Sequence, residues 1–133
     1  MAESNVDLVR RGFFEAFTNG GVEALLPFVH PEFEATTPAE LAAEPDTYRG
    51  PEGIRRYFDS FYEAMDQIRF EAEDYIEVGD RVVVPFKLTA RGRTTGLEFD
   101  QRAVQVWEAR DGLGYRLEVY ANLDEAMAAA KGS

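Results

Sequence analysis

The apolar residues of this chain change their spacing near Gln67, and that change constrains the fold more than any other feature of the sequence. Before it, apolar residues recur at helical intervals, as in Val6, Val9, Phe13 and Phe17. After it, apolar and polar residues alternate over long runs, which is typical of strands with one buried face. Helices first and long antiparallel strands later predict an α+β fold with the helices on one face of a single sheet.

Turn and capping residues divide the chain into an expected order of α-α-β-α-β-β-β-β. The Thr-Asn-Gly-Gly stretch at 18–21 stops the first helix, Pro31 ends the second, and Pro51 suits the first position of the third. We expect helices at 4–17, 22–29 and 51–65, and strands at 33–37, 68–78, 82–90, 99–107 and 115–123. Residues 124–133 would form a short helix or a frayed end.

The expected strands are long enough to curve the sheet, because ordinary strands have about five or six residues and long ones twist strongly. A strongly curved, mixed but mostly antiparallel sheet wrapped round the N-terminal helices would form a cone with an internal apolar pocket. The length of 133 residues and the lack of an internal linker predict a single domain over residues 1–133.

The composition argues against several classes of partner. A net charge of −11 opposes binding to nucleic acid, which needs clustered Lys and Arg, and adsorption to an anionic membrane. The chain has no cysteine, which excludes disulfides, thiolate catalysis and zinc–thiolate sites. No apolar run approaches the ~20 residues of a membrane span, and the polar start does not read as a signal peptide. We therefore expect a cytoplasmic protein that binds neither nucleic acid nor membrane.

Four stretches of the sequence form a recognisable set: "FFEAFTNGGVEALLPFVHPEFE" (13–34), "YRGPEGIRRYF" (48–58), "VGDRVVV" (78–84) and "VWEARDGLGYRLEVYANLDEAM" (106–127). In this order they resemble one known family, the SnoaL-like branch of the nuclear-transport-factor-2-like superfamily. The resemblance implies a cone-shaped α+β fold with an apolar cavity. Because the family includes isomerases, epoxide hydrolases, dehydratases, polyketide cyclases and proteins without any chemistry, the fold alone does not decide the reaction.

The resemblance to ketosteroid isomerases implies three catalytic positions, and this chain keeps one polar group suited to its role. Phe13 stands where the family has a tyrosine, so the hydroxyl that would bind an enolate is missing. Thr37 stands at the position of the catalytic base and cannot hold a proton at neutral pH. Gln105 stands at the position of the acid, where its amide could still donate a hydrogen bond to an oxyanion. We therefore expect no steroid isomerisation.

Other reactions of the family are disfavoured in the same way. The Asp-Arg-Asp set of limonene-epoxide hydrolases would fall on Phe86, Leu88 and Val119, which are all apolar. The Tyr-x-Asp pattern of many SnoaL-like chains ends here in Asn122, which puts cyclase chemistry in doubt. Scytalone-type dehydratases use several pocket histidines and tyrosines, whereas this chain has a single histidine.

That histidine, His30, stands directly before Pro31 at the expected end of the second helix. A cation is favoured at a helix C-terminus by the helix dipole. General acid–base catalysis would need the ring to face the cavity, and a position at a helix end commonly faces the rim instead. We interpret His30 as a structural corner residue.

Few polar side chains fall on the expected inner faces. Gln101 and Gln105 share the parity of Ala103 and Trp107, so their amides should enter the pocket, although they could instead bond each other, water or a hydroxyl. Asp74 shares the parity of an apolar strand face and could be an acid of raised pKa, unless a bulge turns it to solvent.

The leading hypothesis is a protein that binds a small hydrophobic or aromatic ligand in this pocket without a cofactor or metal. As an enzyme it would be a cofactor-independent isomerase, cyclase, hydrolase or dehydratase. Gln105 would stabilise an oxyanion, and Asp74, Tyr48 or Tyr62 would carry a proton. The residues expected to bind the ligand are Phe13, Phe17, Thr37, Phe58, Tyr62, Phe86, Gln101, Trp107 and Val119.

The alternative is a non-catalytic dimeric ligand-binding or interaction module of the same fold, whose cavity is only a partly filled core. Two or more titratable groups deep in the cavity would favour the enzyme, and none would favour the module. A homodimer is expected in either case, because Val104 and Val106 would otherwise leave apolar surface in water on the outer face of the sheet.

Overall fold

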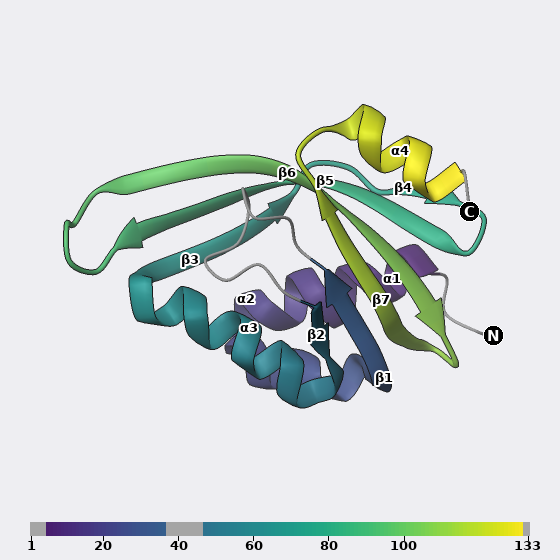
Figure 1. Ribbon diagram of the computed structural model, residues 1–133, viewed down its shortest axis with the longest axis horizontal. Helices are drawn as coiled ribbons and strands as arrows, with labels where there is room; N and C mark the ends of the chain where they lie inside the picture. Colours follow the sequence, from purple (N-terminus) through teal and green to yellow (C-terminus); the bar gives the residue numbers. More distant parts are fainter. Residues whose placement is uncertain (1–4, 37–46, 132–133) are drawn as a thin grey trace.

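The computed structural model describes residues 5–36 and 47–131, which form one curved sheet with helices on both of its faces (Figure 1). The helical segments are α1 (Asn5–Val9), the π-helical turn η1 (Arg10–Glu15), α2 (Ala16–Leu25), the 3-10 turn η2 (Leu26–Phe28), α3 (Gly50–Ala64) and α4 (Leu123–Lys131). The strands are β1 (Val29–Thr36), β2 (Thr47–Arg49), β3 (Met65–Ala72), β4 (Ile76–Val78), β5 (Arg81–Gly92), β6 (Glu98–Arg110) and β7 (Leu113–Tyr120).

The sheet runs in the order β2-β1-β7-β6-β5-β3, and β4 also pairs with β5. β1 and β7 are parallel, whereas the other pairs are antiparallel. The long β5–β6 pairing runs from Arg81 opposite Glu108 to Arg91 opposite Glu98. This mixed, mostly antiparallel sheet behind N-terminal helices confirms the predicted α+β fold class.

The chain leaves the helical conformation earlier than predicted. Val29 has φ −102° and ψ 127°, so β1 begins there instead of at Phe33. The physical reason is that Pro31 disfavours a helical conformation for His30, and pairing with β7 offers the backbone other partners. The position predicted for His30 at a helix end is therefore wrong, because it lies in the strand β1.

Two strands also differ from the prediction. Thr47–Arg49 forms β2 within the stretch expected to be a loop, where it pairs with β1. The single strand expected over 68–78 is divided into β3 and β4. Between them the chain bends, and the backbone N–H of Glu73 donates to the carbonyl of Pro85 at 2.7 Å.

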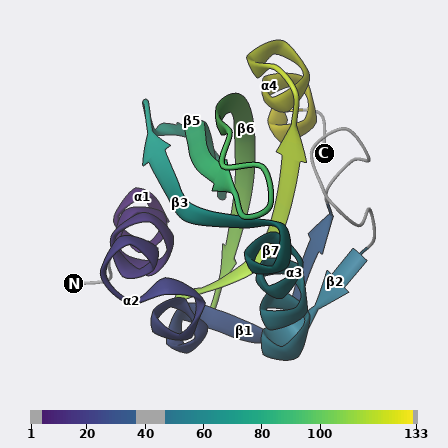
Figure 2. The same ribbon diagram turned by 90° about the vertical axis from the view of Figure 1, so that its left-hand side faces the viewer.

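One face of the sheet packs against α1, η1, α2 and α3 (Figures 1 and 2). Alternation along β5 directs Val82, Val84, Phe86 and Leu88 into this layer, and all four are buried. They join the aromatic residues of the helices in one apolar core, as the period of two predicts.

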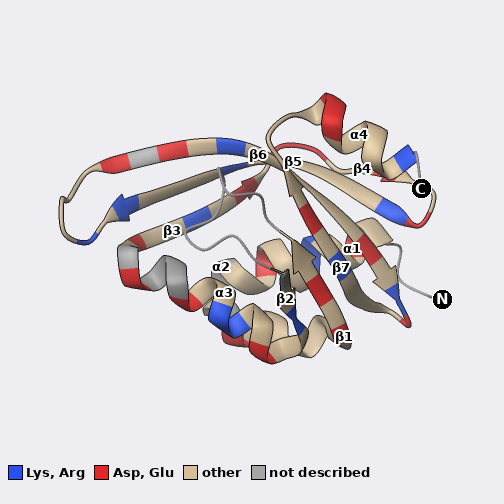
Figure 3. Cartoon of the chain, viewed as in Figure 1, with Lys and Arg blue, Asp and Glu red and all other residues tan. Residues whose placement is uncertain are grey.

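Acidic and basic residues are interspersed over the described helices and strands (Figure 3). Several form exposed pairs between elements, such as Arg55 with Glu23 at 3.1 Å and Arg102 with Glu73 at 3.2 Å. Exposed pairs of this kind contribute at most about 1 kcal/mol each. No helix within the described ranges is long and apolar enough to cross a membrane.

α4 covers part of the opposite face of the sheet (Figure 1). Val83, Val104 and Val106 form a second apolar cluster with Ala126 and Ala130 of this helix. The two valines of β6 are only 4% and 3% exposed. The expectation that they leave apolar surface in water is therefore wrong, because the C-terminal helix folds back over them, and they provide no reason for a dimer.

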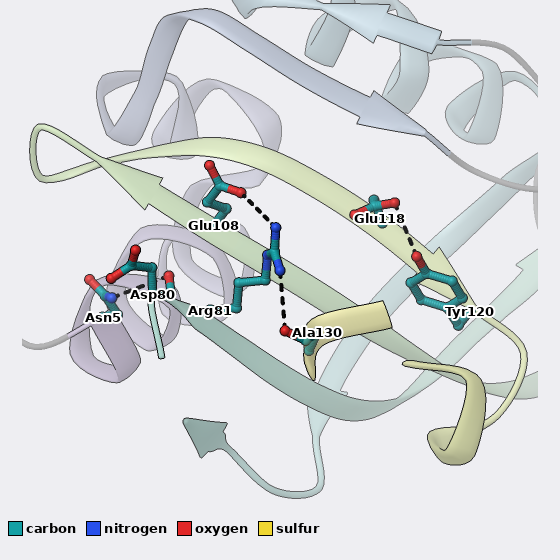
Figure 4. Close-up of polar contacts among 7 residues, drawn as sticks. All are labelled: Asn5, Asp80, Arg81, Glu108, Glu118, Tyr120 and Ala130. Carbon is teal, nitrogen blue, oxygen red and sulfur yellow. Dashed lines mark hydrogen bonds and ion pairs between the residues drawn. The ribbon is translucent and has the colours of Figure 1, made fainter. Parts of the chain in front are cut away.

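Polar contacts attach α4 at both of its ends. At its start, the side-chain oxygen of Asn122 accepts the backbone N–H of Glu125 at 2.9 Å, as a helix cap does. At its end, the Arg81 guanidinium donates to the carbonyl of Ala130 at 3.1 Å and pairs with Glu108 at 3.4 Å (Figure 4). Asn122 thus caps the helix, a role that an aspartate at this position could also fill.

Candidate ligand-binding site

A small cavity lies in the inner layer between η1, α3 and the strands β3, β5, β6 and β7. Its volume is about 20 Å³, which is room for about one water molecule. The residues that line it are Phe13, Tyr57, Phe58, Phe70, Phe86, Leu88, Gln101, Ala103, Gln105, Leu117 and Val119. The lining is therefore apolar or aromatic except for the amides of Gln101 and Gln105.

Aromatic rings occupy most of the space that the cone could enclose. Phe13 lies 5.3 Å from Trp107 and 5.4 Å from Phe70 between ring centroids, and Phe17 lies 5.1 Å from Phe58. Such distances are typical of favourable aromatic pairs. The interior is thus a packed aromatic core with a residual cavity in it.

Phe13 reaches this core from the π-helical turn η1. Such turns are rare and occur frequently at functional sites. Gly12, beside it, is needed for close packing, because a Cβ there would lie 3.0 Å from the side chain of Phe28. The local backbone and the neighbouring glycine together place the Phe13 ring at the centre of the core.

A second cavity of about 20 Å³ lies on the other side of Phe13. Its lining residues are Asn5, Leu8, Val9, Gly12, Phe13, Leu25, Phe28, Val29, Val82, Trp107, Glu108, Ala109 and Gly114. Phe13 belongs to both walls. The prediction that one apolar chamber fills the cone needs this correction: the Phe13 ring separates two small cavities.

The aromatic and aliphatic residues predicted to line the chamber are nevertheless buried together. Phe13, Phe17, Phe58, Phe86, Trp107 and Val119 are each at most 7% exposed and belong to one cluster. Four of the six line the first cavity, whereas Phe17 supports its rings and Trp107 lies beside Gln105.

Apart from aromatic side chains, Gln105 is the one buried polar side chain in the described part of the chain, with 2% exposure. Its Oε1 accepts a hydrogen bond from the indole N–H of Trp107 at 2.7 Å. An indole nitrogen can only donate, so the amide oxygen must face it. Among the side chains and backbone groups that the structure describes, the amide nitrogen of Gln105 has no hydrogen-bond partner. The site therefore contains a buried donor next to a cavity.

Gln101 lies four residues before Gln105 on β6 and is partly exposed. It lines the same cavity as Gln105. The alternation of the strand thus brings both predicted amides to one site.

The other predicted polar residues lie elsewhere. Asp74 is exposed in the bend between β3 and β4, where its Oδ1 accepts the N–H of Tyr75 at 2.8 Å, so the predicted acid in the pocket is wrong. Tyr48 is fully buried in β2, with its ring tilted against that of Tyr57 at 4.9 Å and under the Arg56 guanidinium, and it does not line the cavity. Thr37 and the side chain of Tyr62 lie outside the described residues.

His30 also lies away from the cavity. Its Nδ1 accepts the N–H of Glu32 at 3.0 Å, and its Nε2 lies 3.5 Å from a carboxylate oxygen of Asp111. The ring packs edge-on against Tyr115, at 5.2 Å. His30 thus joins β1 to the β6–β7 hairpin, as expected for a structural residue, although in a strand.

Some lining residues were not among the predicted ligand contacts. Tyr57 follows Ile54 by three residues and so continues the apolar stripe of α3, which is a signal that the helical period contains. Phe70, Leu88 and Ala103 have the inward parity of their strands, and Leu117 has that of Val119. These residues are apolar, so a prediction of the site that starts from polar side chains does not identify them.

Titratable chemistry is sparse at this site. Among the described lining residues, Tyr57 is the one ionisable side chain, and no Asp, Glu, His, Lys or Arg is present. No group of three or more potential metal ligands occurs in the described part of the chain. The geometry can bind and polarise an oxygen through Gln105, but it offers no carboxylate or imidazole to move a proton.

The comparisons with known proteins agree with this architecture. A family model described as a SnoaL-like domain matches residues 10–116. No curated protein sequence matches the chain.

Solved structures match over nearly the whole chain. An NTF2-like protein from Burkholderia thailandensis E264 has a TM-score of 0.80 and 23% identity, over 94% of this chain and 98% of its own. TerC, co-crystallised with polyporic acid, has a TM-score of 0.78 and 24% identity, over 97% and 98%. A protein with a ketosteroid isomerase-like fold from Catenulispora acidiphila DSM 44928, in complex with trimethylamine, has a TM-score of 0.75 and 15% identity, over 98% and 95%. At these identities the likeness establishes the fold.

Proposed function

Because this chain belongs to the SnoaL-like domain family, we propose that it binds a small apolar or aromatic ligand in the cavity lined by Gln105. The observation that carries the proposal is the amide nitrogen of Gln105, a donor on a side chain only 2% exposed and without a partner in the described residues. An unsatisfied buried donor costs about 1–3 kcal/mol. A ligand oxygen in the cavity would remove that cost.

The small volume of the cavity means that a ligand larger than water must displace side chains. Phe70 is suited to move, because it lies on the edge strand β3, is only partly buried and lines the cavity. It packs against Phe13, Phe17, Phe58 and Phe86. Rotation of this ring toward solvent would widen the cavity without moving the backbone.

The proposal is one of binding, with at most polarisation of a ligand oxygen by Gln105. The absence of a carboxylate or imidazole among the described lining residues favours this over acid–base catalysis. Two structural relatives were crystallised with small molecules, polyporic acid in one and trimethylamine in the other. These cases support small-molecule binding as a use of the fold.

The second candidate is a non-catalytic interaction module whose cavity is imperfect core packing. The volume of about 20 Å³ favours it, because ordinary ligand pockets enclose roughly 300–1,000 Å³. The two candidates differ in one measurable respect, which is saturable binding at Gln105.

Trp107 makes this measurement direct, since it is the single tryptophan of the chain and touches Gln105. We would titrate the protein with polyporic acid, acetophenone and indene, following Trp107 emission and confirming each affinity by calorimetry. Saturable binding that Gln105→Leu weakens for the two oxygen-bearing ligands supports the proposal. Heat and emission that stay flat to millimolar concentrations of all three would overturn it in favour of the interaction module.

A further inference from the structure

Gln105 and Trp107 form a polar pair inside an otherwise apolar core. They lie two residues apart on β6, so both side chains point to the same face of the sheet. Trp107 is 6% exposed, and its N–H donates to Gln105 at 2.7 Å. The pair is thus shielded from water that could replace either partner.

The hydrogen bond removes a choice that a glutamine otherwise has. A free amide can turn over and present either its oxygen or its NH₂ group to a ligand. Turning this amide over would place the NH₂ group against the indole N–H, two donors facing each other in a buried site. The amide is therefore held with its oxygen occupied and its nitrogen available.

The indole ring is itself held in place from several sides. Phe13 lies 5.3 Å and Phe33 6.1 Å from it between centroids. Gly114 leaves the room that the ring needs, because a Cβ at that position would lie 3.2 Å from Cζ3 of Trp107. The donor that orients Gln105 consequently has little freedom to turn away.

We infer that Trp107 is a positioning residue that sets the specificity of the cavity, by restricting Gln105 to the role of donor. The cavity then takes apolar ligands with an acceptor oxygen, such as an aryl ketone, a quinone or a phenolate. Ligands of the same shape whose only polar group is an N–H donor form no hydrogen bond with Gln105 and gain no affinity from it. This inference rests on the proposed binding function and adds the ligand class to it.

Two pairs of isosteric probes test it. Acetophenone and α-methylstyrene differ by a carbonyl oxygen in place of a methylene group, so the ratio of their affinities measures a hydrogen bond donated by Gln105. Indole and indene differ by an N–H in place of a CH₂ group, so the ratio of their affinities measures a hydrogen bond accepted by Gln105. Affinities would be measured by NMR titration on the folded full chain, since this readout does not need tryptophan.

In the wild-type protein we expect acetophenone to bind about two- to tenfold more tightly than α-methylstyrene, the gain of one neutral hydrogen bond. Indole should bind no more tightly than indene. In Trp107→Phe the oxygen of Gln105 is released, so indole should gain about two- to tenfold over indene while the acetophenone preference remains. In Gln105→Leu the preference for acetophenone over α-methylstyrene should disappear, and indole should still bind no more tightly than indene.

Phe33→Leu is the matched control, because it loosens the packing of Trp107 while leaving the hydrogen bond to Gln105 in place. It should keep both wild-type ratios. A purely structural role of Trp107 predicts that Trp107→Phe weakens all four probes alike, with unchanged ratios, and that result overturns the inference.

If Trp107→Phe fails to fold, the affinity ratios of the two probe pairs in the wild-type protein still test the inference. Tighter binding of indole than of indene to the wild-type protein would show that Gln105 can accept, and would overturn the inference while the binding function stands. Equal binding of acetophenone and α-methylstyrene would show that Gln105 donates no hydrogen bond to the ligand, and would also overturn the inference. Failure of all four probes to bind would instead overturn the proposed function together with the inference.

Discussion

Gln105 carries an acceptor and a donor on one amide, and the two atoms have different surroundings. The oxygen bonds the indole of Trp107, whereas the nitrogen lacks a partner among the described residues. The oxygen therefore serves the core and the nitrogen is available to a ligand. Replacing the residue should affect both stability and binding, so the two effects need separate measurements.

We expect Gln105→Leu to lower the free energy of unfolding by roughly 1–3 kcal/mol, because it leaves the buried indole N–H of Trp107 without an acceptor. Trp107→Phe should also destabilise, but the double variant should cost less than the sum of the two. Removing both partners leaves no unsatisfied group, so the coupling should be on the order of 1 kcal/mol. Urea denaturation followed by circular dichroism measures this cycle, and strict additivity would contradict it.

Phe13→Ala tests the division of the interior into two cavities. Phe13 lines both, so its removal should join them into one larger apolar space. We expect a loss of about 3–5 kcal/mol in the free energy of unfolding. The joined cavity should bind benzene, seen as a rise in melting temperature that the wild-type protein does not show. A variant that collapses and gains nothing from benzene would be evidence against this division.

At the scale of elements, α4 gives the sheet a second covered face. Its small residues Ala126 and Ala130 let the helix approach Val83, Val104 and Val106 closely. The helix is short, with bounds at Leu123 and Lys131. Short helices depend on tertiary contacts for their stability, so the contacts at its ends matter.

Arg81→Ala should loosen the C-terminal end of α4. The guanidinium is 18% exposed and holds both the carbonyl of Ala130 and the carboxylate of Glu108. We expect a loss of roughly 1–3 kcal/mol, since hydrogen bonds to charged groups are among the stronger ones. Arg102→Ala is the matched control, because its pair with Glu73 is exposed and should contribute at most about 1 kcal/mol. Equal losses in the two variants, by chemical denaturation, would count against the role of Arg81.

Tyr120, which packs against the cluster under α4, makes stability depend on pH in the alkaline range. Burial, followed by the hydrogen bond that its hydroxyl donates to Glu118 at 3.0 Å, raises its pKa to about 12 (Figure 4). In the unfolded chain the phenol ionises near pH 10. Between these values the unfolded state binds fewer protons, so the stability present below pH 10 is lost as pH rises toward 12.

The variant Tyr120→Phe isolates this effect. The difference in unfolding free energy between the wild-type protein and the variant should be constant below pH 9 and should shift in favour of the variant from pH 10 to 12. Denaturation curves at a series of pH values measure it. A difference that does not change with pH would show that the phenol ionises equally easily in both states.

At the scale of the whole molecule, α4 decides what the outer face of the sheet offers to another protein. With the helix in place, Val104 and Val106 are buried. A chain cut after Asn122 would expose them together with Val83, and we expect it to self-associate more than the full chain. Light scattering at micromolar concentration compares the two, and the same mass for both would contradict this role of α4.

Several features of the fold and site were predictable because they depend on neighbours in the sequence. The alternation along β6 places Ala103, Gln105 and Trp107 on one face, and the structure confirms that all three are buried. The helical spacing of Phe13 and Phe17 likewise predicted their place in the core. The same local argument failed for Asp74, because the break between β3 and β4 turns its side chain to solvent.

By itself, the sequence determined the class of the fold, the inward residues and the candidacy of Gln105, because periodicity and residue chemistry are local properties. Only the tertiary structure decided that α4 covers Val104 and Val106, and that the Phe13 ring lies between two small cavities. It also decided which atom of Gln105 is occupied. The physical reason is that cavities and hydrogen-bond partners depend on side chains packed from distant parts of the chain, such as Gly114 and Phe33 around Trp107.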